Sequence, residues 1–408
     1  MIKLDEGDII QRPLIVRSKP VQVSGGDLQW LRQQNILNSL RALREACAPL
    51  TLTELVTQTG LSRASVGDVV AELQQRGWIA EVEPAPGTLG RPAKRYRFRT
   101  DAGHVLGIDV GVHKVLAVVT DLAGRTVSSG RVAVDRHTAR HERLEAAWRA
   151  IDAALVASGL AASDLWGATA GSTGVVNREG LVTRVDDLPD WPGVDLAGHL
   201  GQRLPCPITI ENDSKLAALA EQRLGVAAGV RDLVYLHVGR RPGAAIILNG
   251  QLHHGFSGAT GEVGLMEITG WRTMAGRLES CPAAAGASPQ EAARFVFDAA
   301  RAGDPEARAA VDVYARHLAL GTAAMVLTLD PELVVLGGGF SRSADVLLPA
   351  LNRALEPHCL RLPDIRPSTL GEECVALGGA CLALDHVDEW LFSLEGTSSS
   401  PAAPRRLP

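Results

Sequence analysis

The sequence predicts an α/β protein with two lobes around one ligand cleft, preceded by a small helical module. Two stretches, residues 107–111 and 210–213, predict the cleft because each ends an apolar run. The first is an Asp-x-Gly turn between two expected strands, which brings backbone N–H groups and the carboxylate of Asp109 together. The second places Asp213 where a strand passes into a helix, the position at which open α/β sheets bind ligands. A capped helix-turn-helix pattern near the amino terminus predicts the small module.

Length and composition describe a globular protein. The 408 residues suffice for two or three domains, and 46% hydrophobic with 21% charged residues is an ordinary balance. The sequence has no apolar run long enough for a membrane span and no apolar core of a signal peptide, so we expect a cytoplasmic protein without a membrane partner. The six cysteines are scattered without a Cys-x-x-Cys pair, which argues against disulfides and a zinc knuckle.

The net charge of −5 is unevenly distributed. Residues 27–99 carry 10 Lys and Arg against 7 Asp and Glu, whereas residues 100–408 carry 27 against 36. A mildly basic module on an acidic body favours contact between that module and phosphate groups.

The pattern of apolar runs and breakers predicts five parts. We expect a flexible arm over residues 1–26, the helical module over 27–99, a first lobe over 101–204, a second lobe over 205–393 and a disordered tail over 394–408. In the first lobe we expect strands at 104–109, 113–120, 125–134 and 165–170 and a helix over 140–158. In the second lobe we expect strands at 233–238, 244–248 and 333–336 and helices over 291–329, 343–356 and 378–390, the first broken near Gly303.

Three helices are expected in the amino-terminal module. The first begins at Asp27 and has an apolar face of Ile36, Leu40, Leu43 and Cys47. The second begins with a capping box formed by Thr51 and Glu54, and Gly60 ends it. The third is capped by Ser62, and its buried face is expected to be Val66, Val69, Val70 and Leu73.

The third helix is the expected recognition helix of a DNA-binding module. Its first turns would enter the major groove with Ser62, Arg63, Ser65 and Asp68. A wing follows, with a strand at 78–82, a Pro/Gly-rich turn, and Arg95, Arg97 and Arg99 alternating with Tyr96 and Phe98. Arg91 and Lys94 would contact DNA from this wing. The alternative is a three-helix domain that binds protein.

Five motifs in order resemble the ROK family of repressors and sugar kinases, over roughly residues 27–390. They are Asp109-x-Gly111, Gly171-Ser172-x-Gly174, Asn212-Asp213, Gly261-Glu262-Val263-Gly264 and the run over residues 330–339. The resemblance implies a two-lobed, actin-like sugar-kinase fold of ribonuclease H-like repeats, preceded by a winged helix-turn-helix.

The same resemblance implies a set of sugar-binding residues. Gly171, Asn212, Asp213, Glu262 and Glu279 match the family positions near the sugar, and Asp213 matches the catalytic base. Asp213 is alternatively a ligand-binding group or a helix cap, and the two glutamates are alternatively solvated surface charges.

The two phosphate loops depart from the family pattern. Asp109 and Gly111 are kept in the first loop, but Val112 and His113 replace a second Gly and a Thr. The second loop keeps its glycines, Gly239 and Gly243, but holds two arginines and Pro242 between them, and proline has no N–H donor.

The family's structural zinc site is also altered. Leu265 replaces its His and Cys281 has no companion cysteine nearby, so we expect no zinc and no other cofactor.

Taken together, these features predict a regulator rather than an enzyme. We expect a transcriptional repressor that binds double-stranded operator DNA as a homodimer or homotetramer and senses a sugar or sugar derivative in a degenerate kinase cleft. The alternative is an active ATP-dependent sugar kinase with an appended DNA-binding domain.

Overall fold

The computed structural model describes residues 25–82, 93–186, 188 and 190–393. They belong to two compact units, one within residues 1–73 and 81–97 and the other within 74–80 and 98–408. Most of the expected arm, the whole expected tail and the wing turn with Arg91 lie outside the described residues.

The amino-terminal part of the described chain forms three helices and a three-stranded sheet of order β1-β3-β2. Its elements are α1 (Gly25–Glu45), β1 (Leu50–Thr51), α2 (Leu52–Thr59), α3 (Arg63–Arg76), β2 (Ile79–Val82) and β3 (Arg95–Phe98), of which residues 74–76, 79–80 and 98 belong to the larger unit. Ile36, Leu40 and Leu43 are buried as expected, but the expectation for Cys47 is wrong. Cys47 is exposed because α1 ends at Glu45, before the next turn of the apolar face.

Helices α2 and α3 begin where local side chains satisfy their free backbone groups. The Oγ1 of Thr51 accepts a hydrogen bond from the N–H of Glu54 at 3.2 Å, and the Glu54 carboxylate accepts one from the N–H of Thr51 at 2.6 Å. Gly60 ends α2 with a φ of 70°, and the Ser62 hydroxyl accepts the N–H of Ser65 at 3.1 Å. The predicted capping box, turn and buried face of α3 are therefore confirmed.

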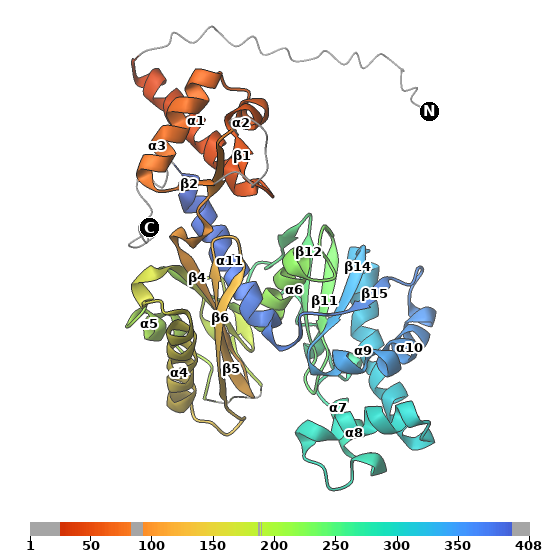
Figure 1. Cartoon of the computed structure of the whole chain (residues 1–408). Helices are drawn as coiled ribbons and strands as arrows, with labels where there is room; N and C mark the ends of the chain where they lie inside the picture. The colour runs from red at the N-terminus through yellow and green to blue at the C-terminus, as the bar shows by residue number, and fades with distance from the viewer. Residues whose placement is uncertain (1–24, 83–92, 187, 189, 394–408) are drawn as a thin grey trace, which may run out of the picture. The chain divides into compact units, whose positions relative to one another are not determined.

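The larger unit contains two five-stranded sheets (Figure 1). The first has the order β10-β7-β4-β5-β6, with β10, β7 and β4 parallel and β5 and β6 antiparallel. Its strands are β4 (His104–Val110), β5 (Lys114–Asp121), β6 (Thr126–Ala133), β7 (Leu165–Ser172) and β10 (Ile208–Asn212). Alternate residues of β4 and β5 pack against α4 (Arg140–Ser158), and α5 (Leu196–Gly201) contacts β10.

The second sheet has the order β13-β12-β11-β14-β15. Its strands are β11 (Leu233–His237), β12 (Gly243–Leu248), β13 (Gln251–Leu252), β14 (Leu333–Gly337) and β15 (Asp364–Pro367). The helices that follow β10 are α6 (Asp213–Leu224), α7 (Ala275–Glu279), α8 (Pro289–Ala302), α9 (Pro305–Leu329), α10 (Ala344–Leu355) and α11 (Cys374–Leu391). Of these, α11 returns to the first sheet, where it contacts β4 and β7. The break expected near Gly303 is present between α8 and α9.

The expected boundary between the lobes, after residue 204, is wrong. Strand β10 pairs in parallel with β7, so residues 208–212 complete the first sheet instead of beginning the second. Parallel pairing joins residues that are distant in sequence, and no local pattern reports it. Helix α6 follows β10 directly and carries the chain across to the second sheet, where it contacts β11 and β12.

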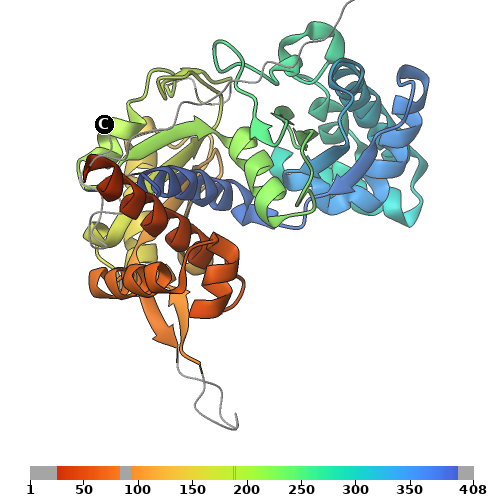
Figure 2. The same cartoon turned by 90° about the horizontal axis from the view of Figure 1, so that it is seen from above.

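Helices α6 and α11 lie side by side, and both pack directly against backbone at glycines (Figures 1 and 2). A Cβ on Gly107 would lie 1.8 Å from the carbonyl oxygen of Ala376, and one on Gly378 would lie 1.9 Å from that of Leu216. Only glycine permits this approach of α11 to β4 and to α6. The first turn of α11 thereby reaches the region between the two sheets. None of the described helices is both long and apolar enough to cross a bilayer.

Candidate functional site

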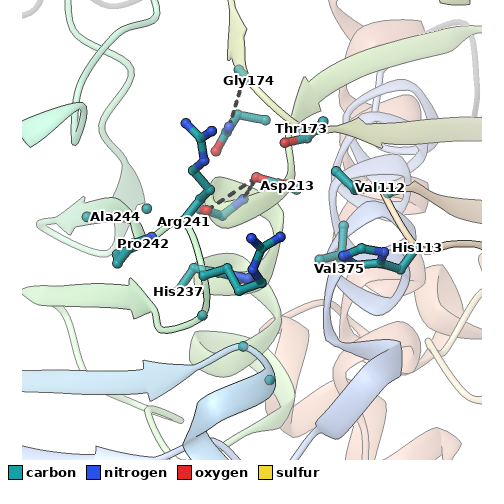
Figure 3. A pocket seen from close by; sticks show the side chains of 18 of the residues that line it. Val112, His113, Thr173, Gly174, Asp213, His237, Arg241, Pro242, Ala244 and Val375 are labelled. Carbon is teal, nitrogen blue, oxygen red and sulfur yellow. Dashed lines mark hydrogen bonds between the residues drawn. The ribbon is translucent and has the colours of Figure 1, made fainter. Parts of the chain in front are cut away.

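The two sheets enclose a cleft of about 760 Å³, a volume within the usual range of small-molecule sites. It is lined by the β4–β5 turn, the end of β7, the β10–α6 junction, the β11–β12 loop and the start of α11. Figure 3 shows Asp213 between two walls, with Val112 and His113 on one side and Arg241 and Pro242 on the other.

The β10–α6 junction brings two polar side chains to the cleft. The Asn212 Oδ1 accepts the N–H of Lys215 at 3.0 Å and caps α6, while its Nδ2 donates to the carbonyl of Gly174 at 2.8 Å. The Asp213 Oδ1 accepts the N–H of Ser214 at 2.6 Å. Burial raises the pKa of Asp213 to about 6, and the hydrogen bonds from Ser214 oppose that shift. Asp213 is thus a carboxyl group that changes charge just below neutral pH.

The first phosphate loop is closed on itself. The N–H of Gly111 donates to the carbonyl of Lys114 at 3.0 Å, so the hairpin already uses this donor. The Nζ of Lys114 lies 3.4 Å from the Asp109 carboxylate, which is 5% exposed. Burial raises the pKa of Asp109 to about 6 against the attraction of Lys114. Val112 and His113 fill the turn where the family pattern has small residues (Figure 3).

The second phosphate loop, residues 239–243, is similarly occupied. The carbonyl of Gly239 accepts the Tyr314 hydroxyl at 2.8 Å, and Gly243 pairs with His237 as the first residue of β12. Pro242 has no N–H to offer, and the side chain of Arg241 extends into the cleft (Figure 3). Pro242 therefore leaves this loop with one backbone donor fewer than the family pattern has.

The structure brings most of the predicted cleft residues together. Those that line it are Asp109, Gly111, Asn212, Asp213, Gly239, Gly243 and Glu262. Gly171 does not, because it faces the packed helices: a Cβ there would lie 2.7 Å from Val375 and 3.0 Å from Leu216. Its neighbours Thr173 and Gly174 line the cleft instead. Glu279 is also outside the lining and pairs with Arg240 at 2.7 Å.

The loop that carries Glu262 is fastened by residues that the sequence analysis missed. Lys215, whose side chain is 2% exposed, donates to the carbonyl of Gly258 and lies 3.7 Å from the Glu211 carboxylate. The same carboxylate is 2.7 Å from His254. Burial raises the pKa of Glu262. Glu211 and Lys215 flank the Asn212-Asp213 motif four residues apart, and this spacing is the one signal that pointed to them.

A cluster of arginines at the cleft was also missed. Arg184, Arg241 and Arg272 all approach Asp186, at 3.4, 3.6 and 3.2 Å. They come from the end of β9 (Val182–Arg184), the β11–β12 loop and the segment before α7. No short-range pattern connects three residues so far apart in sequence.

Four of the predicted DNA-contacting residues, Ser62, Arg63, Ser65 and Asp68, lie around the start of α3. Arg63 and Asp68 are exposed, and the guanidinium of Arg63 donates to the Thr53 hydroxyl at 3.1 Å. The hydroxyls of Ser62 and Ser65 lie 2.9 Å apart within the helix cap. Lys94 pairs with Glu81 at 2.8 Å, and Arg91 lies outside the described residues. Arg95 and Arg97 are exposed on β3 while Tyr96 and Phe98 are buried, which confirms the predicted alternation.

Comparison with known families identifies both modules. The model of the ROK family matches residues 105–386. The chain belongs to the ROK family. The IclR helix-turn-helix domain matches residues 34–83, the part that contains α2 and α3. The predicted family and the predicted helix-turn-helix are therefore confirmed.

Similar proteins include both enzymes and regulators. The bifunctional enzyme NanE/NanK of Brucella suis is 32% identical over 295 residues, which cover 68% of this chain and 53% of that enzyme. The chain therefore spans about half the length of this relative. The xylose repressor of Bacillus spizizenii is 21% identical over 364 residues, which cover 83% of this chain and 92% of the repressor.

Solved structures confirm the predicted fold. A ROK family glucokinase from Streptomyces griseus, in complex with glucose and AMPPNP, matches with a TM-score of 0.59 and 25% identity and covers 69% of this chain and 100% of its own. A ROK family transcriptional regulator, a homologue of the E. coli MLC protein, matches with a TM-score of 0.67 and 19% identity and covers 90% and 100%. Across the described residues, no group of three or more His, Cys, Asp or Glu is placed to hold a metal ion.

Proposed function

We propose that this ROK family protein is a DNA-binding transcriptional repressor whose body binds a sugar or sugar derivative without phosphorylating it. The observation that carries the proposal is the capped α2–Gly60–α3 unit in the same chain as the cleft. Helix α3 begins with exposed residues suited to the major groove. The match to the xylose repressor supports it, since that match extends over 83% of the chain and so reaches beyond the ROK module.

The two loops favour binding over phosphoryl transfer. A sugar kinase places the transferred phosphate with backbone donors and neutralises its charge. Here the N–H of Gly111 bonds within its own hairpin, and Pro242 has no N–H. The remaining cleft keeps Asn212, Asp213 and Glu262, polar groups suited to sugar hydroxyls.

A closing of the cleft by ligand would link the two functions. In a homodimer or homotetramer, a change of lobe angle alters the spacing between recognition helices, and operator affinity depends on that spacing. Ligand binding and DNA binding are then thermodynamically coupled, so that each changes the affinity of the other by the same factor. Such a repressor acts in the compartment that holds the DNA.

A gel-shift titration on the promoter next to the gene for this chain tests DNA binding. We expect a shift that weakens as the salt concentration rises, because cations compete with the protein for the DNA phosphates. Arg63→Gln should also weaken the shift, because it removes a positive charge at the start of α3. Arg353→Gln is the control, since Arg353 pairs with Asp312 on the body at 2.9 Å. Absence of a shift at low salt would refute the repressor.

The second candidate is an ATP-dependent sugar kinase with an appended DNA-binding domain. One observation favours it: Asp213 lines the cleft with a pKa of about 6, suited to accepting a hydroxyl proton. An ADP-release assay over a panel of hexoses separates the two functions. Turnover that Asp213→Asn abolishes would establish the kinase, whereas the repressor shows no turnover with any hexose.

A further inference from the structure

We propose that Lys215 is a positioning residue of the cleft, which ties the loop over residues 253–262 to α6 and so holds Glu262 in place for a sugar. The proposal rests on the proposed function in one respect, that the body binds a sugar. It adds a residue outside those that line the cleft, which acts on the sugar only through Glu262.

The side chain of Lys215 is almost fully buried, with 2% of its surface exposed. A buried ammonium group needs partners that replace its lost water. Its Nζ donates to the carbonyl of Gly258 in the loop and lies 3.7 Å from the Oε1 of Glu211 at the end of β10. Lys215 itself stands on α6, so its charge joins this helix to the loop and to β10. Displacement of the loop would take one partner from a buried charge, which is costly.

The carboxylate of Glu211 connects the same loop to the motif that carries Asp213. Its Oε1 accepts the N–H of Asn212 at 2.6 Å, and its Oε2 lies 2.7 Å from the Nε2 of His254 in the loop. A carboxylate and an ammonium group that are both buried depend on each other, because removal of one leaves the other without a counter-charge. The pair of Glu211 and Lys215 therefore fixes the loop relative to the Asn212-Asp213 motif.

The loop approaches neighbouring backbone closely at two glycines just before Glu262. Gly258 has a φ of 81°, and a Cβ there would lie 2.2 Å from the carbonyl oxygen of Val176. Gly261 has a φ of 94°, and a Cβ there would lie 2.2 Å from the carbonyl oxygen of Ala244. Only glycine permits such approaches, so the loop has little room between them. Since Glu262 follows Gly261 directly, the contact that holds Gly258 also positions Glu262.

The ammonium group of Lys215 acts on Glu262 through its charge as well. Burial raises the pKa of Glu262, and the negative charge of Asp213 raises it further. The positive charge of Lys215 lowers it, while Asp186 and Arg184 act less strongly and in opposite directions. An ionised carboxylate accepts more hydrogen bonds from sugar hydroxyls than a protonated one does. Removal of the Lys215 charge should therefore confine sugar binding to higher pH.

Calorimetry on the full chain tests the proposal with glucose, mannose, xylose and N-acetylglucosamine as probes, over about pH 5 to 8. Lys215→Met removes the charge and the donor, and we expect it to weaken the tightest of these four interactions by about tenfold or more. The pH below which affinity falls should be higher in this variant than in the unmodified chain. Asp213 titrates over the same range in both chains, so the difference between them reports Glu262. Arg353→Met removes an exposed cation that pairs with Asp312 at 2.9 Å, and it should change neither quantity.

Two further measurements separate positioning from a loss of folding. The double variant Lys215→Met with Glu211→Gln leaves no unpaired charge buried, and it should still bind the same sugar about tenfold more weakly. Hydrogen exchange of residues 253–262 should become faster in Lys215→Met. Exchange in α4, which packs on the first sheet, should stay unchanged.

Three results would overturn the proposal. They are an unchanged sugar affinity in Lys215→Met or in the double variant, a weaker affinity with faster exchange throughout the chain and the same pH dependence, and no binding of any of the four sugars by the unmodified chain up to millimolar concentration. The gel-shift experiment is independent of these results. A chain that shifts DNA but binds sugar equally well without Lys215 refutes only the positioning role. A chain whose sugar binding needs Lys215 but that shifts no DNA refutes only the repressor.

Discussion

Two carboxyl groups, the buried Asp109 and the half-buried Asp213, face the same cleft, and each bears on stability as well as on ligand binding. Burial removes water from both and raises the pKa of each to about 6, while an unfolded chain releases these protons near pH 3.8. Between these values the folded chain holds more protons than the unfolded one. Its free energy of unfolding therefore falls as pH rises through this window, and the loss is complete above it.

Asp213→Asn should remove this cost, because the amide keeps an acceptor for the N–H of Ser214 but carries no charge. We expect the free energy of unfolding at about pH 7.5 to rise by about 2 kcal/mol, and the gain to vanish near pH 4. Urea unfolding at the two pH values measures it. Asp364→Asn, at an exposed carboxylate on β15, is the control and should have little effect at either pH. A destabilised Asp213→Asn at the higher pH would contradict the account.

Among single residues, the sequence predicted those whose position follows from the end of a strand. Asp213 and Asp109 were predicted correctly at the cleft, because each directly follows or ends an apolar run. The cluster around Asp186 was not predicted, since Arg184 and Arg272 meet only through the fold of two lobes. Glu279 was expected near the ligand, but Arg240 engages its carboxylate.

Among the elements, α11 packs directly against the backbone of a neighbouring helix. Its Gly378 contacts the backbone of α6, and a Cβ there would lie 1.9 Å from the carbonyl oxygen of Leu216. Since backbone cannot move aside as a flexible side chain does, both helices would have to separate. Gly67, in α3, is the opposite case: a Cβ there would meet no atom within 4 Å.

Gly378→Ala should therefore destabilise the chain by about 1–3 kcal/mol. Gly67→Ala, a matched substitution in an open helical position, should stabilise α3 by about 1 kcal/mol. Urea unfolding followed by circular dichroism, with hydrogen exchange of each helix, measures both effects. Equal stability of the Gly378→Ala variant and the unmodified chain would show that α11 and α6 are not held in this close contact.

Elements defined by local signals were predicted well, and those defined by long-range pairing were not. The capping box of α2, the buried face of α3 and the break between α8 and α9 all follow from neighbouring residues. Strands β1 and β15 were missed because each is short and is fixed by its partner strand. Strand β10 was assigned to the wrong lobe for the same physical reason, since pairing with β7 determines the sheet to which it belongs.

In the molecule as a whole, a cleft with altered phosphate loops and a helix-turn-helix occur in one chain. The match to the bifunctional enzyme NanE/NanK of Brucella suis covers 68% of this chain, whereas the match to the xylose repressor of Bacillus spizizenii covers 83%. A body that holds a sugar without turning it over is suited to report sugar concentration. The strength of this response is the factor by which the ligand changes the affinity for DNA, and in coupled systems this factor is typically about five to 150.

The most direct test of the central claim is the equilibrium affinity of the purified chain for its promoter DNA, measured by fluorescence anisotropy with and without its tightest-binding sugar. ATP is omitted, so that no phosphorylation can contribute. The account predicts that saturating sugar changes the dissociation constant for DNA by about fivefold or more, and that Asp213→Asn together with Glu262→Gln abolishes the change. An unchanged dissociation constant, under conditions where calorimetry shows the sugar bound, would contradict it.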